Sequence, residues 1–216
     1  MIELSVKVVL SYLLGSVIGS LLVGRLSGGV DIRTVGSGNA GATNALRARG
    51  KGFAFAVLLI DIAKGWVATR VIARLAMPGI PPASPAVEAW LVSGCAMAVI
   101  VGHVYPLWYG FRGGKGVATL LGVLIGMDPW LLVPVLITWI LAAMFFGYVG
   151  LASMIAALTL PVSAVAGSGE PNTPLFAFGL FAVLMIVFTH RSNIARMRAG
   201  KEPRARRLWL FGGKDA

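Results

Sequence analysis

The sequence contains, at residues 130–146, the run Trp130-Leu-Leu-Val-Pro-Val-Leu-Ile-Thr-Trp-Ile-Leu-Ala-Ala-Met-Phe-Phe146, which has no charged side chain. A helix needs roughly 20 predominantly apolar residues to cross the hydrocarbon core of a bilayer, and somewhat fewer where the bilayer thins. We therefore predict a membrane-spanning helix over this run, and with it an all-α integral membrane protein.

Apolar runs of similar length recur along the chain and predict further spans. The clearest are Leu4–Leu26, Gly52–Leu75, Val87–Val104 and Pro174–Thr189. Between residues 115 and 169, turn-forming residues at 127–129, 147–150 and 167–172 separate Gly116–Gly126, Trp130–Phe146 and Leu151–Ala166. The first of these three is short, which suits a half-buried or strongly kinked helix. The total is seven spans, with five as the alternative.

Composition supports a membrane protein. The chain has 216 residues, of which 57% are hydrophobic and 12% charged, whereas soluble domains carry about 25% charged residues. The net charge of +11 would also fit a nucleic-acid binder, but the cations sit between and after the apolar runs. We expect no nucleic-acid partner. Cys95 is the only cysteine, which excludes an internal disulfide and a cysteine-based metal cluster.

Charge placement favours an odd number of spans. The loop after the first span holds one acid, Asp31, and five cations: Arg25, Arg33, Arg47, Arg49 and Lys51. A basic tail from about residue 191 holds eight cations: Arg191, Arg196, Arg198, Lys201, Arg204, Arg206, Arg207 and Lys214. Because excess Lys and Arg mark cytoplasmic segments, we expect both inside and the N-terminus outside. We treat residues 1–216 as one membrane-embedded domain.

Three glycine-rich, basic islands interrupt the apolar chain: a first island at 36–47, a second at 103–119 and a third at 190–196. Arg, Lys, His and Asn are costly in lipid unless they face a polar site. Glycines let backbone N–H groups approach a ligand closely, and beside a cation they suit a phosphate. With seven spans, all three islands face the cytoplasm. The pattern predicts a protein that handles a phosphorylated molecule at the membrane surface.

The first island combines small residues with hydrogen-bonding side chains. Its candidate phosphate-binding residues are Gly36, Ser37, Gly38, Asn39, Thr43, Asn44 and Arg47. Backbone amides can surround an anion there while the arginine supplies a two-pronged contact. The alternative is an ordinary interhelical loop rich in turn formers.

The second island resembles a P-loop but lacks its pattern. Tyr109 stands where that motif needs its first glycine, and Gly116, not Ser or Thr, follows Lys115. The phosphate-binding theme survives in Gly113, Gly114, Lys115 and Gly116. His103 ends the preceding apolar run, and a structural hydrogen bond is as good an interpretation of it as a role in chemistry.

The third island places His190, Asn193 and Arg196 three residues apart, on one face of a helix. Glu202 follows closely enough to brace an arginine.

Three further residues lie within apolar runs and are candidates for the site. Asp61 and Lys64 fall inside the second span, where unpaired charges would be costly, so we expect them to pair with each other or with island residues. A structural ion pair and a supporting role in the site remain open. Ser153 lies at a depth suited to the site.

These residues resemble a known family. The patterns are Gly36-Ser-Gly-Asn-x-Gly-Ala-Thr-Asn-x-x-Arg47, then His103-x-x-Pro106 with Phe111-x-Gly-Gly-Lys-Gly-Val-Ala-Thr119, then His190-x-x-Asn193-x-x-Arg196 with Gly200-x-Glu202. In order and spacing they are similar to those of the bacterial acyl-phosphate:glycerol-3-phosphate acyltransferases, the PlsY family. Arg112 stands where lysine is common in that family, which keeps the charge, and the proline-rich loop at 77–85 is rather long.

The resemblance implies a seven-span enzyme of the bacterial inner membrane with a cytoplasmic active site. Such an enzyme transfers a fatty acyl group from acyl phosphate to the 1-hydroxyl of sn-glycerol 3-phosphate, which gives lysophosphatidic acid and inorganic phosphate. It implies catalytic roles for Ser37, Arg47, His103, Lys115, His190 and Asn193. Ser153 and Arg196 join the phosphate-binding set, and Asp61, Lys64 and Glu202 support it. We expect a monomer in contact with membrane lipids, with no cofactor and no metal.

The residues agree with this chemistry in one further respect. Other glycerolipid acyltransferases use a His-x-x-x-x-Asp dyad, but Trp108 stands five residues after His103 and Ala195 five after His190. We hypothesise that the acyl phosphate itself accepts the proton.

Two other classes of protein remain as alternatives. A transporter for an organic phosphate would hold its site near the bilayer midplane, on broken helices in repeated halves. A metal-dependent phosphoalcohol transferase would need clustered carboxylates, whereas the chain has eight acids and no Asp-x-x-x-Asp cluster.

Overall fold

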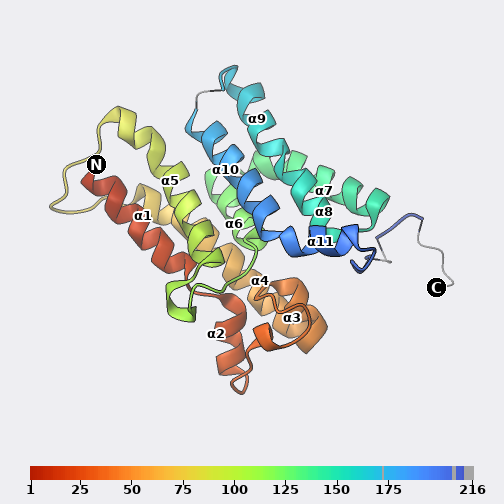
Figure 1. Ribbon diagram of the computed structural model, residues 1–216. Helices are drawn as coiled ribbons and strands as arrows, with labels where there is room; N and C mark the ends of the chain where they lie inside the picture. The colour runs from red at the N-terminus through yellow and green to blue at the C-terminus, as the bar shows by residue number, and fades with distance from the viewer. Residues whose placement is uncertain (172, 206–207, 212–216) are drawn as a thin grey trace. The chain divides into compact units, whose positions relative to one another are not determined.

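The computed structural model describes residues 1–171, 173–205 and 208–211 (Figure 1). The chain divides into two compact units, Met1–Asp128 and Pro129–Ala216. Asn172 of the expected turn, and Arg206, Arg207 and Lys214 of the expected tail, lie outside the described residues.

Every regular element in the described ranges is helical. The first unit contains α1 (Ile2–Gly15), α2 (Gly19–Leu26), η1 (Ile32–Thr34), α3 (Ala42–Arg49), α4 (Lys51–Trp66), η2 (Val67–Val71), η3 (Ile72–Arg74), α5 (Pro85–Val104), η4 (Leu107–Tyr109) and α6 (Val117–Met127). The second contains η5 (Pro129–Leu131), α7 (Leu132–Phe146), α8 (Val149–Ala157), α9 (Thr159–Ser168), α10 (Pro174–Thr189) and α11 (Arg191–Arg198).

The helices occupy all seven predicted places, and local sequence explains several of their ends. Pro85 and Pro174 open α5 and α10, where a missing N–H costs nothing, and the Thr173 hydroxyl accepts from the Phe176 N–H at 3.1 Å. Gly147 and Gly169, both with positive φ, end α7 and α9.

By the length and apolar character of the helices, fewer than seven of the described segments qualify as membrane spans. Within the described ranges, four segments are long and apolar enough to cross a membrane: Lys51–Arg74, Pro85–Tyr109, Pro129–Phe146 and Val149–Ser168. The number rises to six if the bent pairs α1–α2 and α10–α11 each count as one span. At 11 residues, α6 is about 16 Å long, roughly half the hydrocarbon thickness. The membrane protein class holds, while seven spans and the orientation of the termini stay predictions.

The first predicted span, Leu4–Leu26, is wrong as a continuous helix, because α1 and α2 meet at a bend of 46°. Ile18 is extended, and the N–H of Gly19 turns away from the preceding helix to Oδ1 of Asp61 at 3.3 Å. The carbonyls of Gly15 and Val17 accept instead from Lys64 Nζ, at 3.0 and 2.7 Å. A break at membrane depth is tolerated where protein satisfies the freed backbone groups, and here two side chains of α4 do so.

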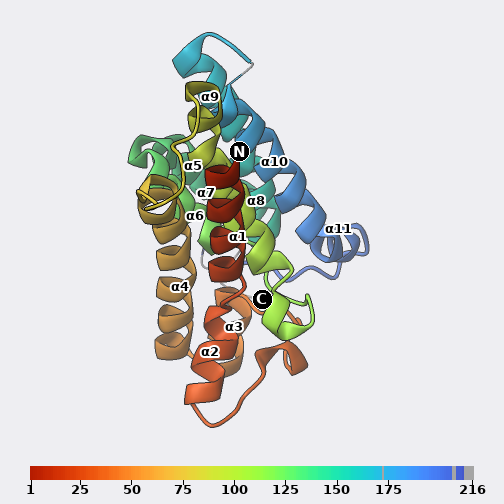
Figure 2. The same cartoon turned by 90° about the vertical axis from the view of Figure 1, so that its left-hand side faces the viewer.

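Glycines allow the helices of the first unit to pack closely. A Cβ on Gly65 of α4 would meet the backbone of α6 at Thr119 and Val123, and a Cβ on Gly122 would meet the Ile62 carbonyl of α4. Gly122 and Gly126 form a small-x-x-x-small face of the kind that brings membrane helices together. α1 and α5 lie side by side in the same way, through Gly15 and Gly102 (Figures 1 and 2).

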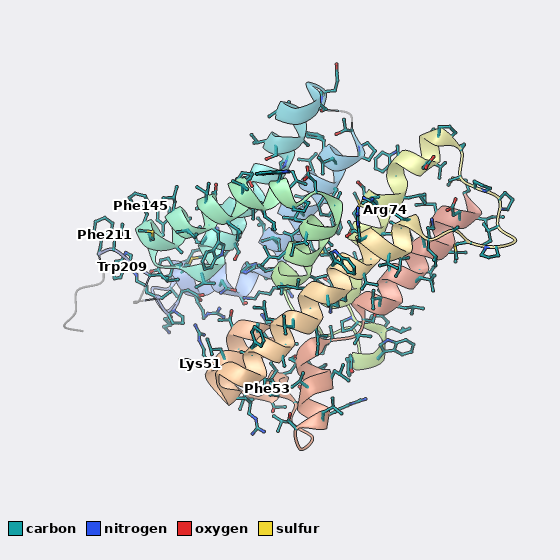
Figure 3. The ribbon with its side chains drawn as sticks, turned by 180° about the vertical axis from the view of Figure 1, so that it is seen from behind. Lys51, Phe53, Arg74, Phe145, Trp209 and Phe211 are labelled. Atoms are coloured by element: carbon teal, nitrogen blue, oxygen red, sulfur yellow. The ribbon has the colours of Figure 1, made fainter. Side chains whose placement is uncertain are left out.

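α4 supports several parts of the first unit. It continues through a wide turn, η2, and a tight turn, η3, so that Phe53 and Arg74 lie toward opposite ends of one rod (Figure 3). α2 and α3 lie beside its N-terminal half (Figure 2). The loop of the first island, between α2 and α3, is therefore attached to the helix that carries Asp61 and Lys64.

The described part of the expected basic tail packs within the second unit. After α11 the chain returns to the end of α7, where Trp209 Nε1 donates to the Phe145 carbonyl at 3.2 Å (Figure 3). The Arg204 guanidinium lies 3.9 Å from the ring centre of Trp209 and 5.0 Å from that of Tyr148. Arg204 thus has a packing role that positive charge alone does not predict.

We expect Gly122→Leu to destabilise the protein by about 1–3 kcal/mol, because the larger side chain forces α6 away from α4. The measurement is the midpoint of thermal unfolding in detergent. Gly52→Leu is the matched control, since nothing lies within 4 Å of a Cβ added there. Equal midpoints for the two variants would contradict the close packing.

Candidate active site

A buried charged cluster joins the second predicted span to the second island. Lys64 Nζ lies 3.0 Å from Asp61 Oδ1 and 2.8 Å from His103 Nδ1, and His103 Nδ1 lies 3.5 Å from Asp61 Oδ1. All three side chains are at most 3% exposed. The expected pairing of Asp61 and Lys64 is confirmed, and an island residue, His103, joins them.

The glycines of the second island pack directly on His103. The N–H of Gly113 donates to the Val104 carbonyl at 3.1 Å, and that of Gly114 to the His103 carbonyl at 3.0 Å. A Cβ on Gly114 would meet the outer edge of the imidazole, with Nε2 nearest. Gly116 adopts a positive φ of 85° and begins α6. Close approach therefore requires glycine at 114, and a left-handed backbone favours it at 116.

The first island is a loop shaped by Asn44. The Asn44 amide nitrogen donates to the carbonyls of Ile32 and Val35 at 2.9 and 3.0 Å, and its oxygen accepts from the Ser37 N–H at 3.0 Å. Gly36 leaves room for that oxygen, because a Cβ there would collide with it. Asn44 is 2% exposed, so its amide acts within the loop.

The same loop is fastened to the break in the first span. Ser20 of α2 donates to the Ala40 carbonyl at 2.7 Å, and Ala40 packs on Ile18 and Leu21. The side chains of Ser37, Thr43 and Arg47 are exposed beyond this anchor. A rigid base thus supports polar groups that remain available to a ligand.

Arg33, which the sequence marks only as one more loop cation, connects η1, the turn directly before the first island, to the second island. Its guanidinium makes a two-pronged contact with Asp31, at 2.7 Å for Nη2 and Oδ2, and Nη1 donates to the carbonyls of Tyr109 and Arg112, both at 3.0 Å. The hydrogen bonds from Arg33 hold the pKa of Asp31 below its usual value. An acid two residues before an arginine, Asp31-x-Arg33, is a weak signal that could have suggested a local pair, but not its carbonyl partners.

In the second unit the third island forms its own network. Glu202 accepts from Asn193 Nδ2 and from Arg196 Nε, each at 2.6 Å, so it braces an arginine as expected. His190 Nδ1 lies 2.8 Å from the Ile186 carbonyl. A Cβ on Gly150 of α8 would lie 3.1–3.2 Å from atoms of Asn193 and His190, so this glycine lets α8 approach the island.

Ser153 is engaged within the second unit. Its hydroxyl donates to the Val149 carbonyl at 3.0 Å and accepts from Trp139 Nε1 at 3.2 Å, which joins α7 to α8. The side chain is buried. Its hydroxyl oxygen has a second lone pair, so it can still accept one hydrogen bond from a ligand.

The predicted site residues thus fall into two groups of contacts. In the first unit the structure brings together the first island, the second island and the Asp61–Lys64 pair. In the second it brings together His190, Asn193, Arg196 and Glu202. Arg47 is exposed, and Lys115 lies half-buried beside the packed glycines. A helical membrane protein with cations and glycine loops at helix ends is the class that these features define.

Comparison with known proteins supplies the family. The glycerol-3-phosphate acyltransferase family model matches residues 5–200. The glycerol-3-phosphate acyltransferase of Bordetella pertussis is 43% identical over 203 residues, which cover 93% of this chain and 91% of that protein. The protein of the same name from Thiobacillus denitrificans is 39% identical over 199 residues, or 91% of this chain and 94% of the relative.

Solved structures agree. The fold is similar to that of PlsY, an integral membrane glycerol 3-phosphate acyltransferase, in its glycerol 3-phosphate form, with a TM-score of 0.80 and 33% identity over 93% of this chain and 94% of that one. For the lysophosphatidic acid form the TM-score is 0.79 at 31% identity. The chain therefore belongs to the glycerol-3-phosphate acyltransferase family, the PlsY family, and is an acyltransferase. The organic-phosphate transporter gains no support from these relatives.

We expect Arg33→Lys to loosen both loops, because one ammonium cannot reproduce the guanidinium's contacts with a carboxylate and two carbonyls. Backbone amides at 35–40 and 110–113 should exchange hydrogen faster, as followed by mass spectrometry. Arg49→Lys is the control, since within the described residues the Arg49 side chain makes one hydrogen bond, to the Ser27 carbonyl at 3.3 Å. Unchanged exchange in the Arg33 variant would contradict the role of this contact.

The lowered pKa of Asp31 also predicts a pH dependence. Because the folded-state pKa lies below the unfolded one, the contribution of this pair to stability is present at neutral pH. It is lost as pH falls through the lowered pKa, below about pH 4. Protection factors at 35–40, which compare each amide with its intrinsic exchange rate at the same pH, should fall there in the wild type, whereas Asp31→Asn should show low protection at neutral pH as well.

Proposed function

We propose that this protein transfers a fatty acyl group from acyl phosphate to the 1-hydroxyl of sn-glycerol 3-phosphate, forming lysophosphatidic acid and inorganic phosphate. The observation that carries the proposal is the family match over residues 5–200, which includes all three islands. The relatives are named for glycerol 3-phosphate, and one solved structure is its glycerol 3-phosphate form. Because the match extends through both units, we propose that residues 1–216 work as a single acyltransferase domain and as a monomer.

In the first unit we assign phosphate binding to exposed groups on braced loops. Arg47 and Lys115 supply charge, and Ser37 and Thr43 supply hydroxyls. We assign further donation to the backbone N–H groups of Gly36, Asn39 and Gly116. Gly38, Gly113 and Gly114, whose N–H groups donate to the Val35, Val104 and His103 carbonyls, shape the two loops around the phosphate. Two substrates that both carry phosphate need several such donors, because each must be bound without strong repulsion by the other. Asn44, Asp61 and Lys64 shape the loops that present these groups.

In the second unit we assign substrate contact to His190, Asn193 and Arg196, with Ser153 as a buried acceptor. The carboxylate of Glu202 holds Asn193 and Arg196 in place. Its negative charge next to Arg196 also moderates the positive charge of the island. This arrangement suits a site that releases phosphate as a product.

We propose substrate-assisted catalysis. The 1-hydroxyl oxygen attacks the acyl carbonyl carbon and forms the ester C–O bond, the bond from that carbon to the phosphate oxygen breaks, and phosphate leaves with the electron pair. The hydroxyl proton passes to a phosphate oxygen, so no protein base is required. Acyl phosphate is a reactive mixed anhydride, and positioning with charge stabilisation can supply most of the acceleration.

For location we propose the bacterial inner membrane, with seven spans and the islands on the cytoplasmic side. The cations at 25–51 and in the tail from about 191 support this orientation. Glycerol 3-phosphate is a water-soluble substrate, whereas the acyl donor and product are lipids, so a site at the inner surface of the bilayer meets both.

The test is phosphate release by the purified protein in detergent, with palmitoyl phosphate and with or without glycerol 3-phosphate. We expect phosphate release that depends on glycerol 3-phosphate, with lysophosphatidic acid as co-product. With palmitoyl-CoA in place of palmitoyl phosphate, we expect no lysophosphatidic acid. Acceptor-independent hydrolysis alone, or turnover of the CoA ester, would refute the proposed reaction.

Arg47→Ala should lower kcat/KM by on the order of 10²–10³-fold, as loss of a charged donor to a reacting phosphate does. Arg49→Ala is the matched control, since Arg49 is exposed on the same helix, α3, two residues further on. Equal losses in the two variants would show that Arg47 acts only through general charge.

His103→Gln and His190→Gln should each lose only about 10-fold in kcat, as removal of a positioning hydrogen bond does. A general base would cost 10²–10⁴-fold, on the order seen when acid–base catalysis is removed. The kcat–pH profile should keep its shape in both variants. Loss of its basic limb in either one would contradict substrate-assisted catalysis.

A further inference from the structure

We propose that Lys64, held by Asp61, is a positioning residue that fixes His103 in the tautomer with its proton on Nε2. His103 then presents a hydrogen-bond donor, not a base, to the glycine loop at 113–116. This inference rests on the proposed function for its consequence in catalysis, but its geometry stands on the buried cluster alone.

The hydrogens of Lys64 decide the tautomer. Its ammonium nitrogen lies 3.0 Å from the Gly15 carbonyl, 2.7 Å from the Val17 carbonyl and 2.8 Å from His103 Nδ1. An ammonium has three hydrogens and no lone pair, and carbonyl oxygens only accept. Asp61 Oδ1, at 3.0 Å, is a fourth acceptor around this nitrogen, so the carboxylate shares a hydrogen with another acceptor. The separation of 2.8 Å from Nδ1 is a hydrogen-bond distance and is shorter than the one to the carboxylate, so a hydrogen of the ammonium points at Nδ1, which must offer a lone pair.

The other protonation states of His103 conflict with the same distances. A proton on Nδ1, in a neutral ring or in an imidazolium, would face the Lys64 ammonium donor to donor across 2.8 Å. The carboxylate oxygen that could receive such a proton, Asp61 Oδ1, is farther away at 3.5 Å. That oxygen also accepts from the Gly19 N–H and pairs with Lys64. His103 is therefore neutral, with its one ring proton on Nε2.

The protonated nitrogen is turned to the second island. Nε2 is the ring atom nearest to the position of a Cβ on Gly114, and Gly114 itself donates to the His103 carbonyl. The Nε2–H thus lies against the glycine loop that carries Lys115 and Gly116, to which we assign phosphate binding. A nitrogen that carries a proton cannot accept one from the attacking hydroxyl, whereas it can donate to a phosphate oxygen.

His190 provides an internal contrast. Its Nδ1 lies 2.8 Å from the Ile186 carbonyl, which can only accept, so this nitrogen carries the proton. The two histidines are therefore held with the proton on opposite ring nitrogens. They are the only two in the chain, so ¹⁵N-histidine labelling gives two ring systems and no others.

The experiment is a long-range ¹H–¹⁵N correlation spectrum of the full-length, ¹⁵N-histidine-labelled protein in detergent at neutral pH. Protonated and bare ring nitrogens resonate in well-separated ranges, and His190→Gln assigns the two rings. We expect His103 to show a bare Nδ1 and a protonated Nε2. A protonated Nδ1 on His103, in a neutral or a charged ring, would overturn the proposal.

Lys64→Met tests the cause. We expect His103 Nδ1 to become protonated, because the ammonium that donates to this nitrogen is gone and the Asp61 carboxylate remains as an acceptor. Lys7→Met is the matched control, because Lys7 is 2% exposed and Lys64 is 3% exposed. Lys7 pairs with Glu3 at 2.6 Å, and its described partners include no histidine. A bare Nδ1 that persists in a folded Lys64→Met protein would exclude Lys64 as the cause, and if that variant fails to fold, the wild-type spectrum decides.

The spectrum is independent of turnover. The expected tautomer in a protein without acyltransferase activity would refute the proposed function and leave the role of Lys64 intact. The opposite tautomer in an active enzyme would refute the role of Lys64 and leave the proposed function intact.

Discussion

Backbone groups freed at the break between α1 and α2 place the strongest constraint on the first unit. The carbonyls of Gly15 and Val17 and the N–H of Gly19 have no partner in a continuing helix, and in an apolar environment each would cost several kcal/mol. Lys64 and Asp61 satisfy all three. Removing either side chain would leave the other as an unpaired buried charge and would leave backbone groups without a hydrogen-bond partner. The first role of this ion pair is therefore to stabilise the fold.

Several features of the site follow from that break. Because the chain turns at Ile18, α2 can carry Ser20 and Leu21 to the first island, where they hold Ala40. Because Lys64 is fixed at the break, it also meets His103 at the end of α5, next to Gly114. Polar side chains that are costly in a membrane thus share partners, and each compensates the burial of the others.

Rigidity and exposure are divided between different residues. The side chains of Asn44, Arg33 and Glu202 form hydrogen bonds with neighbouring backbone and side chains. Ser37, on the loop before α3, and Arg47, on α3 itself, remain exposed. Such a division lets a loop hold its donors in place before a phosphate arrives, and so lowers the ordering cost of binding.

The sequence by itself determined the helical membrane class, the seven helix locations and the three islands, because apolar runs, turn residues and family patterns are local signals. It also required Asp61 and Lys64 to find partners. Only the tertiary structure decided that these partners include a broken backbone and His103, that Arg33 bonds to the second island, and that the short helix α6 packs on Gly65. Contacts between residues 39 to 79 positions apart depend on how helices pack, and no local pattern encodes that geometry.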